Sequence, residues 1–156
     1  MTREKRGRWL AAFAAVVLVL AAGVPAAAQR RVHLPGLRGG QLSEADLARG
    51  ATVLVVWASW SPRCRDVVER ANAVAGRWGG RARIATVNFQ EDPEAIERFL
   101  AGKQSSVPVY LDRDGEFSKA HAVTALPGLV VFRDGKVVFA GRLPADPDAV
   151  LGEHLN

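Results

Sequence analysis

The chain has 156 residues, which is the size expected of one domain. Apolar residues make up 49% and charged residues 24%, which excludes a wholly disordered chain, a collagen and a coiled coil. The net charge is +5, but the first 28 residues carry +3 of it and the remaining 128 carry only +2. That remainder lacks the strong positive charge of a nucleic-acid-binding domain, so we expect no nucleic acid among the partners.

The first residues have the layout of a secretory signal. A basic stretch over residues 1–8 precedes an uncharged apolar run from Trp9 to Val24, and small residues follow up to Ala28. The apolar run is shorter than the roughly 20 residues that a bilayer-spanning helix needs. We therefore expect residues 1–28 to be a signal peptide that is cleaved, or else retained as an N-terminal anchor. The protein is then secreted across the cytoplasmic membrane to the periplasm or cell envelope, and it contacts the membrane only through this segment if uncleaved.

Cys64 is the only cysteine of the sequence. A single thiol excludes an intramolecular disulfide and a zinc site built from several thiolates. His33, His121 and His154 fall in separate elements that do not obviously converge, so we expect no metal site. A glycine-rich phosphate loop is also missing from the sequence, and we expect no cofactor. In an oxidising compartment, a lone thiol is either an inert buried residue or one that reacts between molecules.

After the leader, residues 29–41 are rich in Gly, Arg and Pro and predict an extended lead-in. We place one domain over residues 42–156. A short helix is predicted over residues 43–48, because Ser43 is a preferred N-cap and the acidic Asp46 stands three places on, as in a weak capping box.

The remaining elements alternate between strands and helices. The continuous apolar run Thr52–Trp57 (TVLVVW) is typical of a strand buried on both faces. Ser61 and Pro62 favour the start of a helix that ends near residue 79, since serine suits the N-cap and proline the first helical position. Further strands are predicted at 83–89, 107–111, 129–132 and 136–140, and further helices at 92–103, 116–122 and 147–155. This order predicts an α/β fold with a mixed sheet and helices on both faces.

The most informative segment leaves the first strand and enters the helix: residues 57–64 read W-A-S-W-S-P-R-C. It resembles the thioredoxin-like superfamily, in particular the TlpA/ResA-type subgroup, where the same place reads F-W-A-S-W-C-x-x-C. Residues 107–123 (VPVYLDRDGEFSKAHAV) and 124–143 (TALPGLVVFRDGKVVFAGRL) resemble the middle segment, proline loop and final hairpin of that subgroup. The resemblance covers about residues 42–155 and implies a thioredoxin fold, a central mixed β-sheet flanked by helices on both faces.

The resemblance implies a chemistry that this chain has partly lost. In the family, a first cysteine attacks the partner and a second, one helical turn on, resolves the mixed disulfide. The first position is Ser61 here and the second is Cys64. A serine hydroxyl cannot form a disulfide, so the two-step exchange is lost in its usual form. We expect Ser61 and Cys64 to form a monothiol site with weak or no autonomous disulfide exchange.

Two further positions depart from the subgroup's pattern. Relatives carry a polar or acidic residue in the strand and often a glutamate after the second cysteine, and both help to move protons. Val55 and Val67 stand there instead, and neither can act as an acid or a base. Asp66 is adjacent, but one residue on a helix turns a side chain by about 100°, which directs it away from the site.

Pro127, after Leu126, matches the family's cis-proline. The resemblance implies that the backbone before it pairs with an extended partner peptide as an added strand. The alternative is an ordinary trans turn proline. Gly128 replaces the usual Thr or Ala and predicts a looser loop. We expect the substrate-binding residues to be the following: Trp60, Pro62, Arg63, Leu126 and Pro127.

Three functions remain open. The first is a thiol-disulfide oxidoreductase acting on protein or peptide thiols and disulfides of the envelope. In that function Cys64 works as a monothiol beside Arg63 and Arg65, whose positive charge favours a thiolate, and the Ser61 hydroxyl accepts from the Cys64 N–H. The second is a non-catalytic module that binds peptides or proteins.

The third function is a single-cysteine peroxidase, because peroxiredoxins share this fold and carry P-x-x-x-[ST]-x-x-C. Trp57 stands at the proline of that motif, so half of it is missing. We interpret Trp57 as a core residue and Trp60 as part of the site wall. The acidic residues around Glu91 are interpreted as a helix start with a solvated face.

Overall fold

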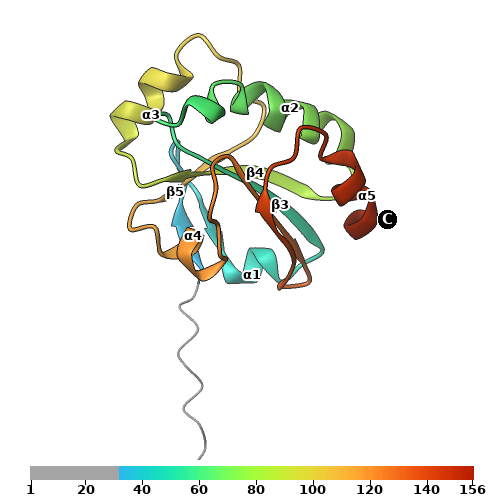
Figure 1. Cartoon of the computed structure of the whole chain (residues 1–156). Coiled ribbons are helices and arrows are strands. Elements are labelled where there is room, and N and C mark those ends of the chain that lie inside the picture. Colours follow the sequence, from blue (N-terminus) through green and yellow to red (C-terminus); the bar gives the residue numbers. More distant parts are fainter. Residues whose placement is uncertain (1–31) are drawn as a thin grey trace, which may run out of the picture. The chain divides into compact units, whose positions relative to one another are not determined.

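The computed structural model describes residues 32–156 (Figure 1), so the predicted signal peptide lies outside the described residues. The main sheet of this range has the strand order β5-β4-β3-β6-β7. Its strands are β3 (Ala51–Trp57), β4 (Arg83–Phe89), β5 (Val109–Asp112), β6 (Gly128–Arg133) and β7 (Lys136–Arg142). The helices are α1 (Glu44–Leu47), α2 (Val67–Trp78), α3 (Pro93–Leu100), α4 (Glu116–Ala120) and α5 (Asp148–Leu155). None of these helices combines the length and the apolar character that a bilayer span requires.

The sheet is mixed, as the sequence predicts. Strand β3 pairs in parallel with β4 and antiparallel with β6, β4 pairs in parallel with β5, and β6 and β7 form an antiparallel hairpin. The hairpin turns at Asp134 and Gly135, which both have positive φ, the backbone geometry that favours an Asp-Gly pair. The predicted α/β architecture is therefore confirmed.

Strand β3 separates two apolar cores. Val53, Val55 and Trp57 belong to a cluster with side chains of α2, α3 and α5, whereas Leu54 and Val56 belong to a second cluster with side chains of α1 and α4. Figure 1 shows α2 and α5 on one side of the sheet and α1 and α4 on the other. Helices on both faces explain why this strand is apolar at every position except the buried Thr52, rather than at alternate positions only.

The predicted lead-in is more structured than an extended segment. Strands β1 (His33–Pro35) and β2 (Gln41–Ser43) pair antiparallel, and their central residues, Leu34 and Leu42, are buried in the second core. A bridge between Gly36 and Tyr110 joins this hairpin to the edge strand β5. The expectation of a merely extended chain missed the hairpin because each strand offers only one buried apolar residue as a signal.

The capping box predicted for α1 is confirmed. The Ser43 hydroxyl accepts from the Asp46 N–H at 3.3 Å, and the Asp46 carboxylate accepts from the Ser43 N–H at 3.0 Å. The Ser43 hydroxyl also donates to this carboxylate at 2.7 Å. These hydrogen bonds from Ser43, with Arg83 at 3.3 Å, hold the pKa of Asp46 well below its usual range. The first helix is thereby fastened to the start of β4.

His121, at the end of α4, is a titratable side chain that packs against the second core. Its ring packs against Phe117 and Phe132 with centroid distances of 4.5 and 5.1 Å. Burial lowers the pKa of His121 below the ordinary value of 6.5, and the nearby Asp112 offsets this in part. The unfolded chain therefore binds a proton at higher pH than the folded chain.

We expect the free energy of unfolding to fall as the pH drops from about 7.5 through 6.5 and below, because protonation then favours the unfolded chain. Urea denaturation at a series of pH values measures this slope. In His121→Phe the slope should be shallower, since the ring keeps its packing but no longer titrates. An unchanged slope in this variant would show that another group sets the pH dependence.

Candidate functional site

The motif segment forms a tight turn rather than the first turn of a long helix. Residues Pro62–Cys64 make a short 3₁₀ helix, and α2 begins only at Val67. The Cys64 N–H donates to the Ser61 carbonyl at 2.9 Å, and the Ser61 side chain makes no capping hydrogen bond. The expectations of an α-helix from Ser61 and of a Ser61 hydroxyl accepting from Cys64 are both wrong, because the backbone carbonyl takes this donor instead.

Cys64 is fully buried, with 0% of its surface exposed. It belongs to the first core cluster together with Val55, Val67 and Leu129, so its surroundings are apolar. The two valines that replace the polar residues of relatives are themselves buried. Asp66 is exposed, in agreement with the prediction that it points away from the site. The sulfur thus lies beneath the surface, next to side chains that cannot carry a proton.

The proline loop lies beside this turn. The Leu126–Pro127 peptide bond is cis, as expected, and the Pro127 carbonyl accepts from the Leu143 N–H at 2.9 Å. Within the described chain, the backbone N–H and C=O of Leu126 make no hydrogen bond. The loop therefore presents one unpaired backbone donor and one unpaired acceptor.

Gly128 does not loosen the loop, and that expectation is wrong. The residue is buried, and a Cβ placed on it would lie 2.8 Å from Val123 Cγ1 and 3.1 Å from the Ala125 carbonyl oxygen. Both distances are shorter than ordinary carbon contacts, so the missing side chain is what allows Val123 and Ala125 to approach. Gly128 packs the loop closely against the start of β6.

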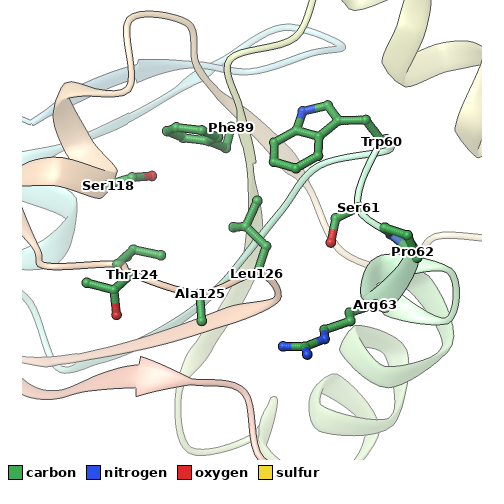
Figure 2. Close-up of a pocket in the computed structure, with 10 residues that line it drawn as sticks. Trp60, Ser61, Pro62, Arg63, Phe89, Ser118, Thr124, Ala125 and Leu126 are labelled. Carbon is green, nitrogen blue, oxygen red and sulfur yellow. The ribbon is translucent and has the colours of Figure 1, made fainter.

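A groove of about 480 Å³ lies between the motif turn and the proline loop (Figure 2). Trp60 is its most exposed large side chain, at 63%, and Figure 2 shows this ring near Phe89 and Leu126. The residues that line the groove are Trp60, Ser61, Pro62, Arg63, Phe89, Ser118, Val123, Thr124, Ala125 and Leu126.

The groove brings together most of the side chains proposed from the sequence. Trp60, Pro62, Arg63 and Leu126 line it, as does Ser61, whose surface is only 7% exposed. Pro127 lies next to Leu126 in the chain but outside the lining, and so does Cys64. In the described part of the chain, the acidic, histidine and cysteine side chains form no cluster that could hold a metal ion.

Glu91 has a role that the sequence reasoning missed. Its carboxylate accepts from the Ser59 N–H at 2.6 Å, from the Ser59 hydroxyl and from the Asn88 side-chain amide at 2.7 Å. The interpretation of Glu91 as part of a solvated helix start is therefore wrong. The sequence did offer a signal for this contact. Ser59 and Glu91 each follow one of two strands that pair in parallel, with Trp57 opposite Asn88, and the carboxyl ends of parallel strands lie at the same edge of a sheet. The Glu91 carboxylate, which follows β4, therefore holds the loop that follows β3 through Ser59.

Comparison with known proteins agrees with this geometry. The model of the AhpC/TSA family matches residues 25–140. Thiol-disulfide oxidoreductase ResA from Bacillus thuringiensis subsp. konkukian is 24% identical over 104 residues, which are 65% of this chain and 60% of ResA. The chain thus spans less than two thirds of the length of this curated relative. The resemblance to TlpA/ResA-type proteins is confirmed.

Similar solved structures cover more of this chain than the curated relative does. A DsbE-type thiol:disulfide interchange protein from Chlorobium tepidum has 26% identity and a TM-score of 0.68, covering 80% of this chain and 91% of its own. A secreted disulfide oxidoreductase of Mycobacterium tuberculosis, homologous to E. coli DsbE, has 22% identity and a TM-score of 0.63 over 77% and 91% of the two chains. Both likenesses confirm the thioredoxin fold.

We expect Glu91→Ala to lower the free energy of unfolding by about 1–3 kcal/mol, because the Ser59 and Asn88 donors lose their acceptor. Urea denaturation of the full chain measures this change. Glu94→Ala is the matched control, since Glu94 is acidic, exposed and three residues away, and it should change the value by at most about 0.5 kcal/mol. Equal effects of the two variants would show that the Glu91 contacts add nothing to stability.

Proposed function

Because the chain belongs to the AhpC/TSA family and has the thioredoxin fold, we propose that it is an exported relative of ResA-type oxidoreductases that binds polypeptide partners and has weak or no autonomous disulfide exchange. The observation that carries this proposal is the state of Cys64, whose sulfur is completely buried behind a turn that begins with Ser61. The monothiol pair Ser61 and Cys64 is the proposed remnant of the catalytic site.

The first argument is steric and chemical. Disulfide exchange begins when a thiolate attacks a disulfide sulfur of the partner, which requires the attacking sulfur to be reachable. Cys64 has no exposed surface, and the position of the attacking cysteine in the family is occupied by Ser61, which is itself only 7% exposed. A well-placed second thiol acts at an effective concentration of about 10⁵ M or more, an advantage that a single thiol lacks. Turnover would depend on dilute external thiol.

The second argument concerns protons. Exchange needs groups that remove a proton from one sulfur and return it to another. The core cluster that contains Cys64 also contains Val55, Val67 and Leu129, and its members offer no such group. The surroundings of the sulfur therefore support packing better than catalysis.

The third argument is that the binding surface is intact. Relatives in this family pair the backbone before the proline with an extended partner segment, and Leu126 has its N–H and C=O unpaired in the described chain. Trp60 supplies exposed aromatic surface beside it, and aromatic residues are common anchors at interfaces. We propose Trp60, Pro62, Arg63 and Leu126, with Pro127 holding the loop, as the binding residues.

Export rests on the basic and apolar leader of residues 1–28. The structural neighbour from M. tuberculosis is a secreted protein, which is consistent with the same location. We place the folded domain in the periplasm or cell envelope. Its partners there are proteins or peptides, including those that carry thiols or disulfides.

A second candidate function is monothiol exchange after the turn opens. It is favoured by one observation, the exposed Arg63 and Arg65 on either side of Cys64, which are the cations expected from the sequence to assist a reactive thiol. Peroxidase activity is less well supported. Trp57, which stands at the proline position of that motif, is a buried core residue whose ring packs 4.9 Å from that of Phe99.

We expect N-ethylmaleimide to leave Cys64 unlabelled in the folded protein at neutral pH and to label it fully in urea, because the sulfur is buried. Mass spectrometry of the intact chain measures the added mass, and Cys64→Ala is the control without a thiol. Rapid labelling of the folded protein would favour the monothiol function. Oxidation of the folded protein by hydrogen peroxide would favour the peroxidase.

We expect Ser61→Cys to give at most weak reduction of insulin with dithiothreitol as the electron source. The variant restores a second sulfur, but Val55 and Val67 still leave proton transfer unassisted. Turbidity of the precipitating insulin chains measures the rate, and Ser61→Ala is the control with neither hydroxyl nor thiol. Activity equal to that of a two-cysteine relative would show that the valines do not limit the reaction.

A further inference from the structure

We propose that the groove selects extended partner segments that carry an acidic side chain next to a large apolar one. In this arrangement the apolar side chain packs against Trp60 and Phe89, and the carboxylate pairs with Arg63. The inference rests on the proposed binding function and adds the chemical class of the partner segment. It follows from the charges of the groove and from the position of its aromatic surface.

The first observation is the charge of Arg63. It is the only charged residue among those that line the groove, and within the described chain no carboxylate pairs with it. Other arginines of this range do find partners, such as Arg38 with Glu97 at 3.0 Å and Arg77 with Asp148 at 2.7 Å. Figure 2 shows the Arg63 guanidinium on the side of the Ala125–Leu126 loop. Its charge is thus available to a segment lying along that loop.

A second arginine stands on the strand next to the proline loop. Arg142 is exposed and lies opposite Gly128, the residue after the cis-proline, in the register of β6 and β7. Arg142 lacks a carboxylate partner in the part of the chain that the structure describes. An acidic residue of a bound segment that reaches Arg63 therefore meets no opposing carboxylate among the residues that line the groove.

The hollow next to the groove has a different lining. It has a volume of about 490 Å³, shares Phe89 and Ser118 with the groove and is bordered by charged side chains of both signs, which include Asp114 and Lys119. The groove itself carries the single cation Arg63. This uneven distribution of charge favours one orientation and one register of a charged segment over the others.

The apolar anchor is the second observation. Trp60 exposes 63% of its surface although most large apolar side chains of the described chain are buried. Figure 2 shows its ring facing Phe89 across the top of Leu126. The loop that carries Trp60 is held by the hydrogen bonds between Ser59 and Glu91, so the backbone from which the ring projects is positioned before any partner arrives. A loop that is already ordered loses little conformational entropy on binding.

The test uses the full chain and fluorescein-labelled heptapeptides with a central Phe flanked by Asp, Asn or Lys. Fluorescence anisotropy at low salt measures each Kd. We expect the Asp peptide to bind about fivefold more tightly than the Lys peptide, because an exposed ion pair with Arg63 changes the affinity by about that factor at most. In Arg63→Glu the order should reverse, so that the Lys peptide binds more tightly than the Asp peptide.

Arg65→Glu is the matched control, because it makes the same change of charge two residues away and outside the groove lining. The Asp preference should survive in it. An unchanged preference in Arg63→Glu, or an equal loss in both variants, would overturn the selection by Arg63. Equal binding of all three peptides would also overturn it while leaving the binding function in place. If none of the three peptides binds, both the selection by Arg63 and the proposed binding function are overturned.

Discussion

The apolar character of β3 is the constraint on which the rest of the structure depends. The strand is covered by helices on one side and by α1, α4 and the β1–β2 hairpin on the other, which explains why all of its residues except the buried Thr52 are apolar. The same constraint reaches the site. Val55 is part of this strand and shares a core cluster with Cys64. Filling the strand with hydrocarbon stabilises the domain and also leaves the sulfur without a neighbouring acid or base.

The loop after β3 is held by groups that take no part in sulfur chemistry. Glu91, from the end of β4, accepts both donors of Ser59, and the 3₁₀ turn closes through the Ser61 carbonyl and the Cys64 N–H. On the opposite wall, Gly128 allows the proline loop to pack closely. The position of Trp60 and the unpaired backbone of Leu126 therefore do not require a cysteine at residue 61. Binding geometry and exchange chemistry are physically separable in this fold.

The sequence predicted those features whose signals are local. The apolar run of β3, the Asp-Gly hairpin and the capping box of Ser43 and Asp46 each occupy a few neighbouring residues, and all three are confirmed. Other features were missed because they depend on three-dimensional contacts. Glu91 lies 32 residues from Ser59, and the close packing at Gly128 arises from the way the proline loop folds back so that Val123 and Ala125 approach it. The split of the helix after Cys64 was hidden because Ser-Pro favours a 3₁₀ turn as well as an α-helix.

Membership of the family and the details of the site answer different questions. The family match and the structural likeness establish the fold, which brings the motif turn and the proline loop together. The chemistry depends on a few atoms, and in this chain the first motif position carries the largely buried Ser61 oxygen while the Cys64 sulfur lies in the core. An enzyme needs both the surface and the reacting atoms, whereas a binding protein needs the surface alone. Trp60, Arg63 and Leu126, which line the groove, belong to the surface that we propose for binding.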